Sequence, residues 1–189
     1  MNSRALDQFL AGIERRAFRI AMLGVRNDQA ALDIVQESMM RLAEKYSHQD
    51  PAEWPLLFQR ILQNAILDHH RRQKVRRAAI TLFGDLLPAG SEDGENPYEG
   101  GVFDVADAEE AQPQAILAQK ELRKALEQAI SALPIRQQQA FVLRYWEGMD
   151  IAQTAQIMGC SEGSVKTHCS RATKALSDQL AFLKQDFHR

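Results

Sequence analysis

The chain has 189 residues, of which 45% are hydrophobic and 25% are charged, and its net charge is −2. This composition is that of a globular protein, and it excludes collagen-like, mucin-like and wholly disordered classes. Two cysteines are too few for a disulfide framework, no secretory leader opens the chain, and no apolar run is long enough to span a membrane, so we expect a cytoplasmic protein.

The charges are distributed unevenly along the chain. Residues 1–77 contain thirteen basic and nine acidic residues, residues 78–116 contain nine acidic residues and no basic ones, and residues 117–189 contain ten basic and seven acidic residues. The middle segment is also rich in glycine and proline and poor in apolar residues, which favours a flexible linker. The sequence therefore predicts two basic domains, 1–77 and 117–189, joined by a flexible acidic linker over 78–116.

Apolar residues in the first domain recur at three- and four-residue spacing, which predicts three helices. They are expected at about residues 3–24, 28–46 and 54–77. Gly24 should end the first helix, and Asn27 or Asp28 should cap the second.

The third predicted helix combines aromatic residues with a dense run of cations. Five of the seven residues from Arg71 to Arg77 are basic. Such a surface attracts a phosphate backbone, and Trp54 and Phe58 beside it could stack on unpaired bases. For the two aromatic residues taken alone, we favour the alternative that they belong to the core.

The second domain is also expected to be helical, with breaks at Pro134 and Gly148. Nothing in it shows the period-two alternation that is typical of strands. The predicted helices cover about residues 118–133, 135–146, 150–158 and 161–183. The predicted fold class is therefore all-α, with two small helical lobes and a linker between them.

The strongest local pattern lies between Ile151 and Leu176. A short helix ends at Gly159, which can adopt the positive φ that a tight turn needs, and Ser161 can cap a second helix. This pattern predicts a helix-turn-helix, although any two amphipathic helices joined by Gly-x-Ser would look similar. The outward side chains of the second helix suit phosphates and base edges in a major groove. They are Glu162, Ser164, Lys166, Thr167, Ser170, Arg171 and Lys174.

Metal and catalytic sites are not expected. Cys160, His168 and Cys169 have the wrong spacing for a zinc site and no fourth ligand nearby. An enzyme acting on nucleic acid through an acid and two histidines, at residues 68–70, is also disfavoured, because neighbouring helix positions point in different directions. We therefore expect no cofactor, no metal and no enzymatic activity.

The order of these motifs resembles the extracytoplasmic-function (ECF) sigma factors of bacterial RNA polymerase, which consist of a region 2 domain, a linker and a region 4 domain. The match covers nearly all of the chain outside the linker. ALDIVQE at 31–37 resembles region 2.2, and RILQN at 60–64 with Asp68, Arg71 and Arg72 resembles regions 2.3 to 2.4. LPIRQQQAFVLRYWEG at 133–148 resembles region 4.1, and GSVKTH at 163–168 with SRA at 170–172 resembles the recognition helix of region 4.2.

The resemblance implies a sigma factor that binds core RNA polymerase and directs promoter-specific initiation. It implies contact with the β′ clamp helices and the β flap of the polymerase, with promoter DNA and with an anti-sigma factor. The implied polymerase contacts are Asp33, Gln36 and Glu37. The implied contacts with the −10 element are Arg60, Asn64, Asp68, Arg71 and Arg72. The implied contacts with the −35 element are Glu162, Ser164, Lys166, Thr167, Ser170 and Arg171.

Two alternatives remain open at this point. Leu57 stands where the family often has an aromatic residue, which leaves Trp54 and Phe58 as candidates for strand separation. The chain could also be a helix-turn-helix regulator that binds duplex DNA by itself as a dimer. Against the second alternative, residues 117–189 offer no evident dimer face, and the polar residues at 33–37 would have no role.

Overall fold

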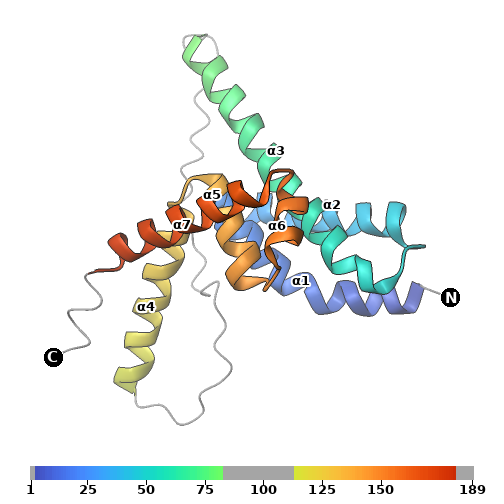
Figure 1. The fold of residues 1–189 in the computed structure, drawn as a ribbon, viewed down its shortest axis with the longest axis horizontal. Coiled ribbons are helices and arrows are strands. Elements are labelled where there is room, and N and C mark those ends of the chain that lie inside the picture. The colour runs from blue at the N-terminus through green and yellow to red at the C-terminus, as the bar shows by residue number, and fades with distance from the viewer. Residues whose placement is uncertain (1–2, 83–112, 182–189) are drawn as a thin grey trace. The chain divides into compact units, whose positions relative to one another are not determined.

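The computed structural model describes residues 3–82 and 113–181 of the chain, and within these ranges the regular secondary structure is entirely helical (Figure 1). The chain divides into two compact units, and the division between Pro97 and Tyr98 falls outside the described residues. The predicted all-α class with two lobes is therefore confirmed. Among the described residues, no helix combines the length and the hydropathy that a membrane span requires.

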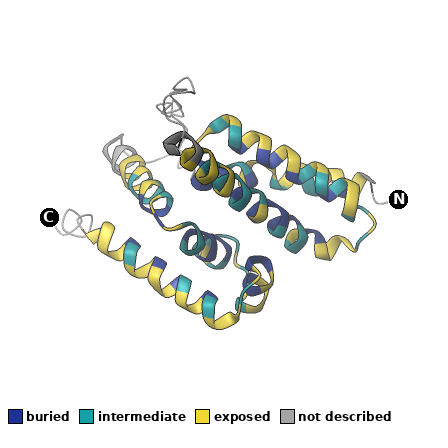
Figure 2. Ribbon diagram, turned by 90° about the horizontal axis from the view of Figure 1, so that it is seen from above, coloured by how far each residue is buried: buried dark blue, intermediate teal, exposed yellow. Residues whose placement is uncertain are grey.

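The first unit contains three long helices and one short 3-10 turn. They are α1 (Ser3–Val25), α2 (Asp28–Tyr46), η1 (Pro51–Glu53) and α3 (Trp54–Leu82). Each of the three long helices lies against the other two, and their buried residues, dark blue in Figure 2, form the inner faces. Trp54 and Phe58 are 1% and 0% exposed, so the interpretation of these aromatics as core residues is confirmed.

The helix boundaries of the first unit agree with the sequence in part. Asn27 caps α2, since its side chain accepts a hydrogen bond of 2.8 Å from the N–H of Ala30. The expectation that Gly24 ends α1 is wrong, because the helix continues to Val25 and Arg26 makes the turn with a φ of 54°. Helix α3 continues to Leu82, five residues beyond the predicted end and into the segment that we expected to be linker.

Within residues 113–181, the second unit has four helices, one of which ends in a π-helical turn. They are α4 (Pro113–Ser131), α5 (Ile135–Phe141) with its π-helical continuation η2 (Val142–Trp146), α6 (Ile151–Met158) and α7 (Glu162–Gln179). Helix α4 begins before residue 118, so residues 113–116, which the sequence analysis placed in the linker, are helical. The rest of the predicted linker, residues 83–112, lies outside the described residues.

Helices α6 and α7 form the predicted helix-turn-helix. Asp150 and Gln153 form a capping box at the start of α6, and Gly159 ends this helix with a φ of 61°. The side chain of Ser161 accepts a hydrogen bond of 3.1 Å from the N–H of Ser164 and so caps α7. The inward residues of α7 are buried as predicted: Val165, Cys169, Ala172 and Leu176.

Candidate functional site

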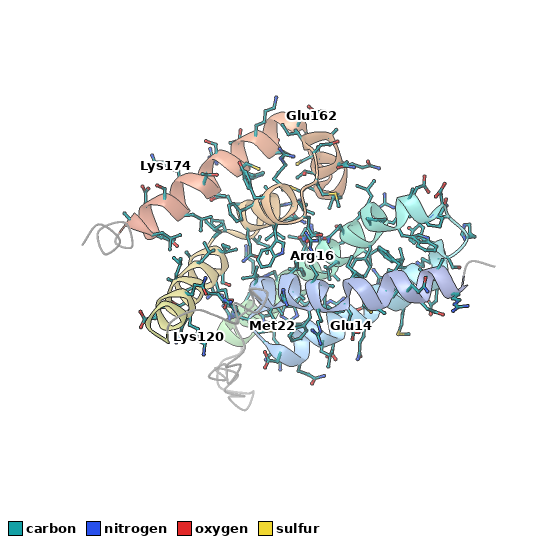
Figure 3. The ribbon with its side chains drawn as sticks, turned by 90° about the horizontal axis from the view of Figure 1, so that it is seen from below. Glu14, Arg16, Met22, Lys120, Glu162 and Lys174 are labelled. Carbon is teal, nitrogen blue, oxygen red and sulfur yellow. The ribbon has the colours of Figure 1, made fainter. Side chains whose placement is uncertain are left out.

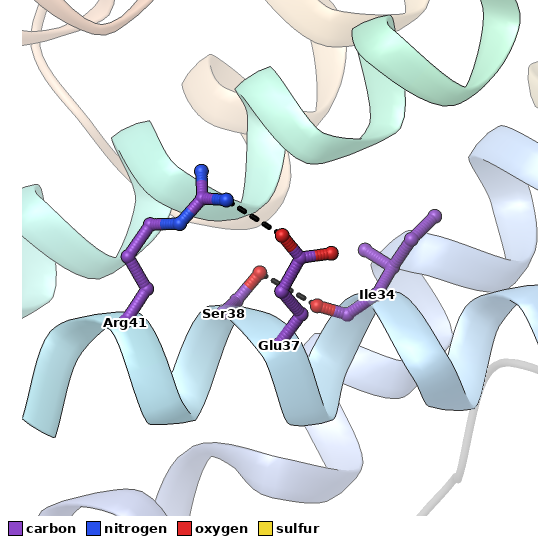
Figure 4. A network of polar contacts seen from close by, with 4 residues as sticks. All are labelled: Ile34, Glu37, Ser38 and Arg41. Atoms are coloured by element: carbon purple, nitrogen blue, oxygen red, sulfur yellow. Dashed lines mark hydrogen bonds and ion pairs between the residues drawn. The ribbon is translucent and has the colours of Figure 1, made fainter. Parts of the chain in front are cut away.

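Helix α2 presents the three implied polymerase contacts on its outer face. Burial of Ala31, Ile34, Val35, Ser38 and Leu42 turns the other side of this helix to solvent. Asp33, Gln36 and Glu37 are all exposed. Nε2 of Gln29 donates to Asp33 at 2.9 Å, and Glu37 pairs with Arg41 at 2.6 Å (Figure 4). Because the Glu37–Arg41 pair is solvent-exposed, it contributes little to stability and Glu37 can exchange Arg41 for another partner.

Two hydrophobic side chains accompany these polar groups, and the sequence analysis assigned neither of them to the site. Leu32 and Met40 are 39% and 61% exposed. With Gln36 between them, they form a row at four-residue spacing along α2, which places all three on one side of the helix. The signal was present in the sequence, because both positions fall outside the buried stripe of the helix. Apolar groups among polar ones are typical of protein-binding surfaces.

Helix α3 carries the residues implied to contact the −10 element, at three- and four-residue spacing. Asn64, Arg71 and Arg72 are exposed, whereas Arg60 and Asp68 are half-buried. Nη1 of Arg71 lies 3.1 Å from a carboxylate oxygen of Asp68. These side chains offer a nucleic acid one amide and several cations, which suit base edges and phosphates respectively.

The aromatic residues at the start of α3 offer no surface for stacking on a base. Trp54 Nε1 donates to the carbonyl oxygen of Tyr46 at 3.0 Å, and the ring centroid of Phe9 lies 5.8 Å from that of Trp54 and 6.3 Å from that of Phe58. These contacts hold both side chains in the core of the first unit. The expectation that one of them is available for strand separation is therefore not supported by the structure.

A groove of about 260 Å³ between α2 and α3 joins the two sets of candidate residues. It places Asp33 and Glu37 on the same surface depression as Asp68 and Arg72, although the sequence analysis assigned these pairs to different partners. Gln36, from the same set as Asp33, does not line it. The lining residues are Ala30, Asp33, Ile34, Glu37, Arg41, Ala65, Asp68, His69 and Arg72.

Helix α7 presents the residues implied to contact the −35 element. Glu162, Lys166, Thr167, Ser170 and Arg171 are exposed. Ser164 differs from them, because it is half-buried and its Oγ lies 2.9 Å from Oγ of the capping Ser161. Thr167 Oγ1 donates to the carbonyl oxygen of Gly163 at 2.9 Å. The long charged side chains therefore have the greatest freedom to reach DNA.

The outer surface of α7 extends beyond the residues that the resemblance assigned. Lys174 is exposed two turns after Thr167 on the same side of the helix, and Figure 3 shows it and Glu162 near the two ends of α7. By contrast, Cys169 faces inward, with its Sγ 3.7 Å from the carbonyl oxygen of Ala140. Burial raises the pKa of the Cys169 thiol, and the nearby charge of Arg144 opposes this only in part.

Comparison with known proteins identifies the family of the chain. The family model for sigma-70 region 2 matches residues 8–76, and the model for sigma-70 region 4 matches residues 123–176. The chain is also 31% identical over 183 residues to the ECF RNA polymerase sigma factor SigM of Mycobacterium tuberculosis, covering 95% of this chain and 79% of SigM. The chain belongs to the ECF sigma factors.

Further relatives of this sigma factor agree with that assignment. It is 27% identical to the RNA polymerase sigma factor SigV of Bacillus subtilis, over 86% of this chain and 83% of SigV. Its fold is similar to that of the sigma factor RpoE from Bartonella quintana, in a co-crystal structure with the anti-sigma factor NepR. The TM-score is 0.63 at 19% identity, covering 94% of this chain and 98% of RpoE.

Membership of this family establishes the general function of the chain. It is a sigma factor of RNA polymerase that directs transcription initiation. The region 2 match contains α2 and the candidate residues of α3, and the region 4 match contains α6 and α7 as far as Leu176. The function predicted from the sequence is therefore confirmed at this level.

Among the described residues, no three histidine, cysteine, aspartate or glutamate side chains gather in a way that could hold a metal ion. Asp68, His69 and His70 do lie on consecutive positions of α3. Nε2 of His70 lies 2.8 Å from the carbonyl oxygen of Gly24, so this ring contacts α1. His69, in contrast, lines the groove between α2 and α3. The two neighbouring imidazoles thus point in different directions, as expected from their sequence spacing.

Proposed function

We propose that residues 1–77 bind core RNA polymerase and the −10 element and that residues 117–189 bind the −35 element. The observation that carries the polymerase contact is the outer face of α2. Asp33, Gln36 and Glu37 are exposed there together, between the exposed side chains of Leu32 and Met40. A carboxylate surface with apolar groups at its edges suits a basic protein partner, and the β′ clamp helices are that partner in our proposal.

Contact with the −10 element is proposed for Arg60, Asn64, Asp68, Arg71 and Arg72 of α3. The amide of Asn64 is exposed and can hydrogen-bond to the edge of an unpaired base. The neighbouring arginines supply charge for the phosphates of a single strand. Asp68 can accept a hydrogen bond from an exposed base, and its carboxylate lies 3.1 Å from the guanidinium of Arg71.

Contact with the −35 element is proposed for the outer face of α7. A capped helix with a buried inner stripe is the form in which a recognition helix enters a major groove. Arg171 and Lys166 are exposed and can reach base edges or phosphates. Glu162, Ser164, Thr167 and Ser170 complete the candidate surface.

The remaining parts of the proposal concern partners and location. We propose that the chain acts in the cytoplasm without enzymatic activity or cofactor, and that region 4 also contacts the β flap. RpoE of Bartonella quintana is bound to an anti-sigma factor, and this fold similarity supports an anti-sigma partner for the present chain. Such a partner would cover the polymerase-binding face of α2.

A gel-shift experiment distinguishes this proposal from a stand-alone regulator. The full chain is mixed with a promoter duplex in the presence and in the absence of core polymerase. The proposal predicts a specific complex only when core polymerase is present. A specific complex with the chain alone, at a stoichiometry of two chains per duplex, would instead identify a dimeric regulator.

A further inference from the structure

Helix α6 depends on contacts at its ends. It has eight residues, and an isolated helix of this length is not stable in water. The capping box of Asp150 and Gln153 satisfies backbone groups at its start. The last carbonyl groups of a helix have no partner within the helix itself. Contacts from neighbouring elements at the two ends of α6 therefore add to the support that its buried side chains give.

Arg136, in the first turn of α5, reaches the C-terminal end of α6. Its Nη1 donates to the carbonyl oxygen of Met158 at 2.9 Å and to Oε1 of Gln139 at 3.1 Å. Met158 directly precedes Gly159, where the chain turns toward α7. A guanidinium group at this position satisfies an end carbonyl and interacts favourably with the helix dipole. The contact thus ties the end of α6, next to the turn, to the first turn of α5.

Arg144, in the π-helical turn η2, contacts the loop that leads into the start of α6. Its Nη1 donates to the carbonyl oxygen of Met149, which directly precedes the N-cap Asp150. The N–H of Met149 in turn donates to the carbonyl oxygen of Leu143 at 2.9 Å. The two arginines stand near opposite ends of the α5–η2 helix, and their acceptors bracket α6. This helix therefore holds α6 at both of its ends.

The same helix also supports α7. Helix α5 lies against α7, and the Sγ of Cys169 is 3.7 Å from the carbonyl oxygen of Ala140. Both helices of the helix-turn-helix therefore rest on α5–η2 through buried side chains, which in α6 include Ile157 and Met158. The two arginine hydrogen bonds, one to Met158 at the end of α6 and one to Met149 just before α6, add to the support of this helix. Loss of the arginine contacts would loosen the packing of α6 and α7 on this helix, so that the buried Cys169 becomes accessible to solvent more often.

We propose that Arg136 and Arg144 are positioning residues that set the orientation of the −35-binding helix-turn-helix. The inference rests on the proposed function of α7. Both side chains are half-buried and donate to main-chain carbonyl groups of their own unit. They hold α6, and with it the start of α7, in the arrangement that sequence-specific contact with DNA requires.

The test uses the full chain assembled with core polymerase and a promoter that the wild-type holoenzyme selects. Transcription from this promoter is divided by transcription from the same promoter with a shuffled −35 element. Arg136→Gln should lower this ratio about fivefold or more, because it removes a charge-assisted hydrogen bond. Arg136→Lys should retain most of the ratio. Lys124→Gln is the matched control, since Lys124 is an exposed cation of α4, and it should leave the ratio unchanged.

Other roles for Arg136 give other results. A phosphate contact would lower transcription from both promoters equally. It would also reduce the slope of log affinity for DNA against log salt concentration by about one. A role in stability alone would lower the melting temperature, and the ratio would return to the wild-type value when transcription is measured well below that temperature. Either result, or a ratio equal to that of wild type, overturns the proposal.

A second readout separates the contact from the proposed function of α7. In a Cys160→Ser background, the rate at which a thiol reagent labels the buried Cys169 should rise in Arg136→Gln and stay at the background rate in Lys124→Gln. An unchanged labelling rate contradicts the contact itself. If the wild-type holoenzyme transcribes equally from the promoters with the intact and the shuffled −35 element, the proposed function of α7 is contradicted. The positioning role then falls with it, even if the labelling rate of Cys169 rises.

Discussion

A Cβ atom on Gly24 would lie 2.7 Å from Cγ2 of Ile66. A side chain at residue 24 of α1 would thus clash with α3, and the carbonyl oxygen of Gly24 lies 2.8 Å from Nε2 of His70 on α3. Ile66 is 3% exposed, so its side chain has little room to move away. The closeness of these two helices depends on the absence of a side chain at residue 24.

Gly24→Ala should therefore destabilise the first unit. Overpacking of a core costs about 1 to 3 kcal/mol and outweighs the gain of up to about 1 kcal/mol in helix propensity. Gly12→Ala is the matched control on α1, where a Cβ meets nothing within 4 Å, and it should stabilise by about 0.5 to 1 kcal/mol. Urea unfolding followed by circular dichroism measures both changes. Equal stabilisation by the two substitutions would contradict the packing role of Gly24.

Charge reversal at Asp33 and Glu37 should abolish binding to core polymerase and leave the fold intact. Both carboxylates are exposed, so the change costs little in folding, whereas juxtaposed like charges at an interface cost several kcal/mol. The double variant Asp33→Lys, Glu37→Lys is compared with Glu44→Lys, which reverses an exposed charge near the end of the same helix. Affinity for fluorescently labelled core is the measurement. Unchanged affinity in the double variant would refute the docking role of α2.

Asn64→Ala should weaken recognition of the −10 element without affecting core binding. The amide is exposed on α3, and its loss removes a hydrogen-bonding group that can pair with a base edge. Permanganate footprinting of the holoenzyme should show reduced opening and an altered −10 preference. Gln8→Ala removes an exposed amide from α1 and should behave as wild type. Normal opening with an unaltered preference in Asn64→Ala would count against the contact.

Arg171→Ala should reduce discrimination among −35 sequences. A side chain that reads a base through two hydrogen bonds contributes about 1 to 3 kcal/mol of discrimination. The measurement is holoenzyme affinity for a set of duplexes that differ only in the −35 element, with Lys124→Ala as the control in the same unit. An equal loss on every duplex would show that Arg171 positions the DNA backbone and does not read its sequence.

Features encoded by neighbouring residues were predictable from the sequence. The Asn27 cap, the break at Pro134, the left-handed Gly159 and the Ser161 cap all depend on a few adjacent positions, and the structure confirms each of them. The inward stripe of α7 was predictable for the same reason, since helical periodicity alone determines it.

Features that depend on distant residues were not predictable in this way. The residues around Gly24 predict the end of a helix. The structure shows instead that Gly24 allows close packing against Ile66 on another helix. The groove between α2 and α3 and the contact of Arg136 with Met158 likewise join residues that are far apart in sequence. Leu32 and Met40 differ from these features, because helical periodicity alone places both outside the buried stripe of α2.

Run-off transcription with purified core polymerase on a library of genomic fragments tests the central claim most directly. We predict that addition of the chain produces new transcripts whose start sites share two upstream sequence elements at a constant separation, and that the Asp33→Lys, Glu37→Lys variant produces none of them. If core polymerase yields the same transcripts with and without the chain, the account of promoter-specific initiation is contradicted.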